Sequence, residues 1–141
     1  MEQLLKPLQL IASPLGRVLI AVLFIMAGFS KITGYAGTQA YMDMMGVPGG
    51  LLPLVILLEI GGGLMLLVGY QTRLVALLLG GFVLISGILF HLIPGAGMEG
   101  MAAQNEQIHF MKNLAIAGGL GFVLANGAGA FSVDSRTGAD A

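Results

Sequence analysis

The feature that most constrains this sequence is an apolar stretch of eighteen residues, 51–68, with a single charge, Glu59, near its middle. A run of this length predicts a membrane-spanning helix, because the hydrocarbon core of a bilayer needs about 20 residues at a rise of 1.5 Å each. A carboxylate inside such a helix costs about 3 kcal/mol unless it meets protein or water. We therefore expect Glu59 to face the protein interior and to have a polar partner.

The composition places the whole chain among membrane proteins. Of its 141 residues, 57% are hydrophobic and 9% are charged, whereas soluble domains carry about 25% charged residues. The net charge of −1 offers no basic surface for nucleic acid. The chain has no cysteine, which excludes disulfides, thiolate metal sites and thiolate-held iron–sulfur clusters. We expect a single transmembrane domain over residues 1–141, embedded in the lipid bilayer.

Four apolar segments predict an all-α integral membrane protein, a four-helix bundle in antiparallel up-down-up-down order. The predicted helices cover roughly residues 14–32, 51–68, 74–93 and 108–125. The second and third helices must be antiparallel neighbours, because only residues 69–73 connect them. The two other connections are longer and fall on one side of the bundle. We expect a short amphipathic helix within residues 33–50, capped by Thr38 and Gly46, and a flexible, glycine-rich lid over residues 94–107.

The basic residues predict the orientation of the bundle. Four of them, Lys6, Arg17, Arg73 and Arg136, fall on one side of the predicted spans, and Lys31 and Lys112 fall on the other. Because cytoplasmic loops of membrane proteins carry an excess of Lys and Arg, we expect both termini in the cytoplasm and the long loops outside. Arg17 is expected to extend to the lipid headgroups, and Asp134 to belong to a solvated tail.

Polar residues near the outer ends of the helices share faces with small residues, which mark the packed surfaces of membrane helices. Glu59 lies one turn from Gly62 and Gly63, so its side chain is expected to point into the bundle. We predict that Glu59 contacts Lys112, directly or through water, in a pocket that opens to the outer side. The surrounding polar residues are Lys31, His91, His109 and Asn113.

Longer motifs contain these residues and together carry a family resemblance. The motifs are GFSKITGYAGTQAYMDMMGVP, LEIGGGLMLLVGYQTR, FHLIPG, QIHFMKNLAIAGG and GAGAFSVD. From about Arg17 to Asp134, they resemble the DoxX family of small four-helix bacterial membrane proteins. The recurring positions of that family correspond here to Lys31, Gly34, Glu59, Gly69, Thr72, Arg73, His91, Phe110, Lys112 and Asn113. The resemblance implies location in the bacterial cytoplasmic (inner) membrane and a role as an oxidoreductase component. The roles associated with the family are quinone-linked electron transfer, thiosulfate oxidation, defence against oxidants and electrophilic quinones, and membrane complexes with soluble redox enzymes.

Together, the residues and the resemblance favour a redox-associated protein that binds a quinone or another small lipophilic molecule. The residues expected to act in catalysis are Glu59, Lys112 and His91, and those expected to bind the ligand are Lys31, Asn113, His109 and Phe110. His91, Lys112 and Asn113 would donate hydrogen bonds to the quinone carbonyls, and Glu59 would carry the proton. No intrinsic cofactor is expected, so a soluble or membrane partner protein or a bound reductant would supply the electrons.

Three other functions fit the same residues. The chain could be a non-catalytic membrane anchor or assembly subunit of a redox complex. A small proton-coupled transporter would use the intramembrane Glu59 as its proton site and would require a homodimer. A haem or metal protein would use His91 and His109 as ligands. This last function is the weakest of the three, because two histidines without a fixed spacing are a weak signal, and no metal site is expected.

Overall fold

The computed structural model describes residues 2–139, and that range contains helices and no strands. The helices are α1 (Glu2–Thr33), α2 (Tyr35–Met44), α3 (Leu52–Val68), α4 (Thr72–Gly87), α5 (Ile93–Gly95), α6 (Gly100–Asn126) and α7 (Val133–Thr137), with a 3₁₀ turn η1 (Gly49–Leu51) and a π-helical segment η2 (Ile88–Leu92). In this range four helical segments, Gln3–Thr33, Gly49–Val68, Thr72–Gly95 and Gly100–Asn126, are long and apolar enough to cross a membrane. The predicted all-α fold with four spans is confirmed.

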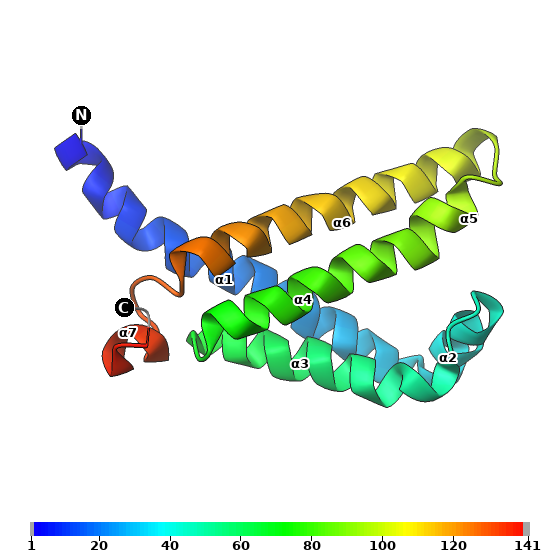
Figure 1. Cartoon of the computed structure of the whole chain (residues 1–141), viewed down its shortest axis with the longest axis horizontal. Helices are drawn as coiled ribbons and strands as arrows, with labels where there is room; N and C mark the ends of the chain where they lie inside the picture. The colour runs from blue at the N-terminus through cyan, green and yellow to red at the C-terminus, as the bar shows by residue number, and fades with distance from the viewer. Residues whose placement is uncertain (1, 140–141) are drawn as a thin grey trace.

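Two helices are longer than the sequence predicted. Helix α1 begins at Glu2 and contains both Pro7 and Pro14, and Figure 1 shows its N-terminal part bending away from the bundle. Proline inside a helix removes one backbone hydrogen bond and produces such a bend. Helix α6 begins at Gly100, so the predicted lid over residues 94–107 is wrong. The helix continues through Ala102, Ala103 and Gln104, which all favour helix, and only residues 96–99 remain as the loop.

The short helix α2 begins earlier than predicted. Thr38 does not cap it but lies inside it, and its hydroxyl donates a hydrogen bond of 3.0 Å to the carbonyl of Gly34, the residue that precedes the helix. At the other end Gly46 has φ +77°, the left-handed conformation in which glycine commonly ends a helix. The Asp43 carboxylate then accepts a hydrogen bond of 2.7 Å from the Gly49 N–H. This bond ties the chain after α2 back to the helix and directs it into α3.

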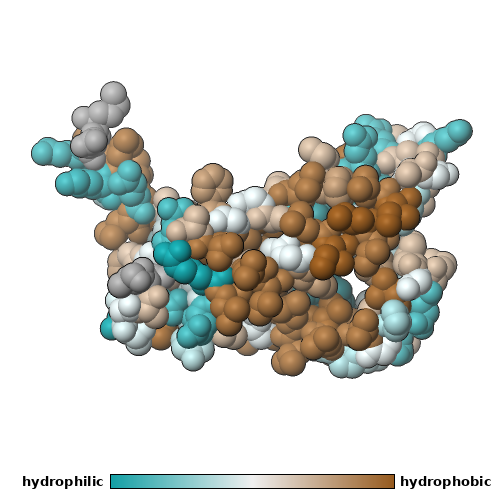
Figure 2. All heavy atoms as spheres, viewed as in Figure 1, coloured by the Kyte–Doolittle hydropathy of each residue, from teal (hydrophilic) through white to brown (hydrophobic). Residues whose placement is uncertain are grey.

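The long helices form two pairs that meet at one end and separate at the other. Helix α1 packs along α3, and α4 packs along α6, whereas contacts between the pairs are fewer. Figure 1 shows that the pairs converge near α7 and diverge toward α2 and α5. Apolar side chains gather along the middle of the helices and hydrophilic ones toward the ends (Figure 2), as expected of a protein that crosses a bilayer. The divergence leaves space between the pairs on the side of α2 and α5.

The buried core lies toward the end where the pairs converge. Its members come from all four long helices: Ala21, Phe24, Leu66, Val75, Ala76, Leu79, Val83 and Leu120. Gly62 allows α3 and α4 to approach, since a Cβ added there would lie 3.2 Å from the Leu79 side chain. Gly69, with φ +69°, ends α3 in the left-handed conformation and reverses the chain toward α4.

Helices α1 and α3 make a close contact at Gly28. A Cβ at this position would lie 2.5 Å from Ile60 Cγ1 and 3.2 Å from Glu59 Cβ. We expect Gly28→Ala to push the two helices apart and to lower stability by about 1–3 kcal/mol, although alanine by itself favours helix over glycine. Gly16→Ala in the same helix is the matched control, because nothing lies within 4 Å of a Cβ there. Thermal unfolding in detergent compares them, and equal melting temperatures for the two variants would contradict this packing.

A polar cluster at the convergent end corrects two expectations from the sequence. Arg17 is only 2% exposed, and instead of extending to the headgroups it donates hydrogen bonds to the carbonyls of Ala128 and Phe131. Asp134 is 4% exposed and does not belong to a solvated tail. Its carboxylate accepts hydrogen bonds from the Gln71 and Thr72 N–H groups at 2.9 and 2.8 Å, which satisfies the N-terminus of α4.

The C-terminal segment therefore joins both helix pairs at this end. The Asp134 N–H donates to the Gly69 carbonyl at 2.9 Å, which adds a third bond between α7 and the turn from α3 to α4. The Arg73 guanidinium donates hydrogen bonds to the Leu124 and Ala125 carbonyls at the end of α6. These contacts hold the pairs together at the convergent end, opposite the space between them.

Candidate functional site

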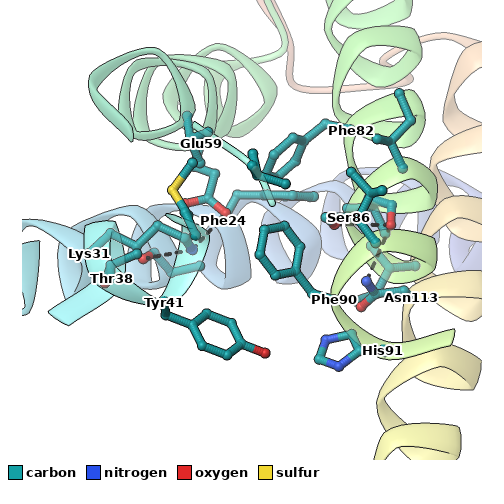
Figure 3. Close-up of a pocket in the computed structure, with 18 of the residues that line it drawn as sticks. Phe24, Lys31, Thr38, Tyr41, Glu59, Phe82, Ser86, Phe90, His91 and Asn113 are labelled. Carbon is teal, nitrogen blue, oxygen red and sulfur yellow. Dashed lines mark hydrogen bonds and ion pairs between the residues drawn. The ribbon is translucent and has the colours of Figure 1, made fainter. Parts of the chain in front are cut away.

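A cavity of about 480 Å³ occupies the space between the two helix pairs. This volume falls in the usual range of small-molecule sites, about 300–1,000 Å³. Figure 3 shows side chains entering it from both pairs and from α2. The lining residues are Leu23, Phe24, Ala27, Lys31, Thr38, Tyr41, Met42, Val47, Leu51, Val55, Glu59, Phe82, Val83, Ile85, Ser86, Leu89, Phe90, His91, Lys112, Asn113 and Ile116. Most of them are apolar, so apolar side chains surround the few polar groups of the cavity.

The partner of Glu59 is Lys31, and within the described residues 2–139 Glu59 makes no direct contact with Lys112, the predicted partner. Lys31 Nζ lies 3.0 Å from Glu59 Oε1 and 2.9 Å from Oε2. Lys112 lines the same cavity, but its Nζ lies 3.3 Å from His109 Nδ1 on its own helix. The prediction that Glu59 faces the interior and has a cationic partner agrees with these contacts, since the Glu59 side chain is 5% exposed.

The packing of α1 against α3 explains why Lys31 is the partner. Gly28 lies against Ile60 and the Glu59 Cβ, so the next turn of α1 brings Lys31 above the carboxylate. The Lys31 chain lies back along its own helix, with Nζ 3.5 Å from the Ala27 carbonyl. The pair belongs to one side of the cavity, as Figure 3 shows, and faces the aromatic rings of Phe24 and Phe90.

The opposite side of the cavity carries His91, in the π-helical segment η2. Pro94 has no N–H for the Phe90 carbonyl, and the helix takes the wider π register just before it, a feature that is frequent at functional sites. His91 Nδ1 lies 2.7 Å from Glu106 Oε2. Within residues 2–139 its Nε2 has no hydrogen-bond partner, so this nitrogen is available to a ligand.

Tyr41 of α2 approaches the same space from the divergent end. Its ring stacks on Phe90, with 5.6 Å between the ring centroids, and links α2 to the α4 side of the cavity (Figure 3). Burial, and then the negative charge of Glu106, raise the pKa of the Tyr41 phenol above its ordinary value of 10.0. The hydroxyl therefore keeps its proton at physiological pH, and it has no hydrogen-bond partner in the described part of the chain.

Asn113 lines the cavity, but one of its N–H groups is already used. Its Nδ2 donates to the Val83 carbonyl at 3.2 Å, and the Ser86 hydroxyl donates to the same carbonyl at 3.1 Å. Gly87 makes room for the amide, because a Cβ there would lie 3.0 Å from Asn113 Nδ2. Asn113 thus ties α4 to α6, and its carbonyl oxygen and second N–H are the groups left for a ligand.

The structure brings five of the seven predicted site residues into one cavity and leaves two outside it. Those that line the cavity are Lys31, Glu59, His91, Lys112 and Asn113. His109 lies behind His91, with 5.1 Å between stacked rings, and Phe110 does not line the cavity. Thr38, Tyr41 and Ser86 also line the cavity and were not among the predicted site residues. Thr38 and Tyr41 are three positions apart on the amphipathic α2, and this spacing was the signal for a shared face.

The arrangement of the two histidines does not suit a bis-histidine haem. Axial ligands must direct a nitrogen at one iron from opposite sides, whereas the rings of His91 and His109 are stacked on each other with 5.1 Å between their centroids, so their nitrogens do not point at a common position between them. Over residues 2–139 there is also no group of three or more His, Cys, Asp and Glu side chains placed to hold a metal ion.

Comparisons with known proteins identify a family and two relatives. The family model described as DoxX matches residues 12–92 of the chain. Inner membrane protein YqjF of Escherichia coli (strain K12) is 48% identical over 130 residues, which cover 92% of this chain and 95% of that protein. Inner membrane protein YphA of the same organism is 32% identical over 124 residues, 86% of this chain and 87% of that protein. No solved structure matches the chain significantly.

Proposed function

Because this chain belongs to the DoxX family of membrane proteins, we propose that it binds a quinone or a similar lipophilic ring compound in the cavity between its helix pairs. The observation that carries the proposal is the placement of a few hydrogen-bonding side chains against apolar walls. Tyr41, His91 and Lys31 reach the cavity from both of its sides. A quinone ring needs an apolar slot and a donor at each of its two carbonyl oxygens, and this cavity offers both.

The charges of the cavity favour an electron-rich oxygen. Glu59 is matched by Lys31, so the ammonium group of Lys112 is a further positive charge on the lining. The aromatic rings of Phe24, Phe82 and Phe90 supply flat apolar surface between the polar groups. A neutral ring with carbonyl acceptors is therefore better suited to the site than an organic cation.

The proposed role is redox-associated, and the orientation follows from the basic residues. No described residue is an electron carrier, so a partner protein or a reductant would exchange electrons with the bound quinone. We place both termini in the cytoplasm of the cell and the divergent end, with the cavity, on the outer side of the membrane. His91 and its partner Glu106 would then exchange protons with the outer aqueous phase.

The Tyr41 hydroxyl and the His91 ring provide the first test of this proposal. We expect Tyr41→Phe to weaken binding of a tail-free benzoquinone about three- to tenfold, because it removes one hydrogen bond worth about 1 kcal/mol. We expect a similar loss for His91→Phe, which removes Nε2; because Nδ1–H is turned to Glu106, this nitrogen donates to a quinone carbonyl in the imidazolium form of the ring. Binding is measured on the protein in lipid nanodiscs, with empty nanodiscs correcting for partition into lipid.

Tyr70→Phe is the matched control. Tyr70 follows the end of α3 and does not line the cavity, so its hydroxyl should be irrelevant to binding. The proposal fails if the wild-type protein binds no quinone, or if Tyr41→Phe and His91→Phe bind as tightly as Tyr70→Phe.

A further inference from the structure

The cavity wall continues into the lipid-facing surface on one side. Leu51, the last residue of η1 before α3, and Ile85, on α4, both line the cavity and yet remain 45% and 60% exposed. A residue that only closed the wall of a sealed cavity would be buried. These two side chains therefore mark an apolar opening between α3 and α4.

The packing of α3 and α4 explains the position of the opening. The two helices are in contact where Gly62 faces Leu79 and where Leu66 joins the core, near the turn at Gly69. Toward α2 they diverge (Figure 1), and Figure 2 shows the surface hollowed at that end between α4 and α2. The opening thus lies along the apolar part of the helices and not in the polar cluster at the convergent end.

The two residues that mark the opening between α3 and α4, Leu51 and Ile85, have hydrocarbon side chains, whereas α6 contributes the cationic Lys112 to the cavity lining. Four of the lining residues contributed by the segments from η1 to η2, Leu51, Val55, Ile85 and Leu89, are aliphatic. In a bilayer such an opening faces the acyl chains. A long apolar tail would remain among hydrocarbon there, while a ring head reached the polar groups of the cavity.

We propose that the ligand is a membrane-dissolved molecule with a long hydrocarbon tail, which enters sideways between α3 and α4 and leaves its tail in that opening. This inference rests on the proposed binding of a ring head in the cavity. It adds the class of the ligand, an amphiphile that comes from the bilayer. It also identifies Leu51, Val55, Ile85 and Leu89 as the residues that contact the tail.

The test compares two ligands with the same head. A decyl-substituted benzoquinone and its methyl-substituted counterpart are bound to the protein in nanodiscs, and each affinity is expressed relative to the ligand concentration in the lipid. The variant Ile85→Trp fills the opening. Leu77→Trp is the matched control, because Leu77 is 55% exposed on the same helix and does not line the cavity. We expect Ile85→Trp to lower the affinity for the decyl ligand at least tenfold and to leave the affinity for the methyl ligand within twofold of the wild-type value. We expect Leu77→Trp to change neither affinity.

Three results would overturn the inference and are distinguishable. If Ile85→Trp binds the decyl ligand like the wild-type protein, the tail does not use this opening. If Ile85→Trp weakens both ligands equally, the residue shapes the head site and not a tail site. In both cases the proposed function stands. If the wild-type protein binds neither ligand, the proposed function fails, and the assignment of the tail fails with it.

Discussion

Lys31→Met should bind a tail-free benzoquinone about ten- to a hundredfold more weakly than the wild-type protein and should melt at a lower temperature. Binding weakens because a hydrogen bond from a charged donor contributes about 1.5–3 kcal/mol. Stability falls because the substitution leaves the Glu59 carboxylate, 5% exposed, without its cationic partner. Removal of one member of a buried ion pair costs about 3–5 kcal/mol, and we expect the lower end because the Lys31 side chain is 26% exposed.

A second variant separates the structural role of the pair from its role in binding. In the double variant Lys31→Met/Glu59→Met no charge is left unpaired, and apolar replacements of a buried ion pair are often neutral or stabilising. We expect the double variant to recover the melting temperature of the wild-type protein but not its affinity for the quinone. If it recovers both, the ion pair only holds α1 against α3, and the assignment of Lys31 to the ligand site is wrong.

Asp134→Ala should produce the largest loss of stability at the other end of the molecule, about 3 kcal/mol or more. The substitution leaves the buried N–H groups of Gln71 and Thr72 without their acceptor, and each unsatisfied buried group costs about 1–3 kcal/mol. It also removes the negative charge at the N-terminus of α4. Thermal unfolding in detergent measures the effect, and Arg136→Ala, an exposed position on the same short helix, is the control.

The pKa of Asp134 gives this prediction a pH dependence. Burial by itself raises the pKa of the carboxyl, but the Thr72 side chain and N–H, the Gln71 N–H and the charge of Arg17 outweigh burial and lower the pKa below its ordinary value of 3.8. A group whose pKa is lower in the folded state stabilises the fold above its ordinary pKa, and that contribution is lost as the pH falls below about 3.8. Asp134→Asn should lack this acid-dependent loss. If wild-type and Asp134→Asn proteins lose stability in parallel below that pH, Asp134 does not hold the convergent end.

The fold was largely predictable because hydrophobic length is a strong signal. Each span of about 20 apolar residues has few alternatives to a transmembrane helix, and the short connection at residues 69–73 fixes two of them as neighbours. The boundaries were harder to predict. Pro14 was expected to start a helix but lies inside α1, because one proline bends a helix without ending it when the residues on both sides favour helix.

The interior position of Glu59 was predicted from the sequence, but its partner was not: Lys112 was expected, and Lys31 is the partner. The sequence gives the depth of Glu59 and Lys112 along their helices, but it does not show which helices pack in pairs. Because α1 approaches α3 closely at Gly28, Lys31 and not Lys112 contacts the Glu59 carboxylate. The burial of Arg17 and Asp134 was missed for a similar reason. Their partners are backbone groups more than 60 positions away, and no local pattern in the sequence marks such a pair.

The most direct measurement of the central claim is photolabelling by a quinone analogue that carries a photoreactive group on its ring. With the protein in nanodiscs, we expect the label on peptides from α3 and from η2 that contain Glu59 and His91, and we expect excess unlabelled quinone to remove it. The stable double variant Lys31→Met/Glu59→Met should lose the same labelling. Labelling spread over lipid-facing positions such as Leu57 and Leu64, and unchanged by competing quinone, would contradict a quinone site between the helix pairs.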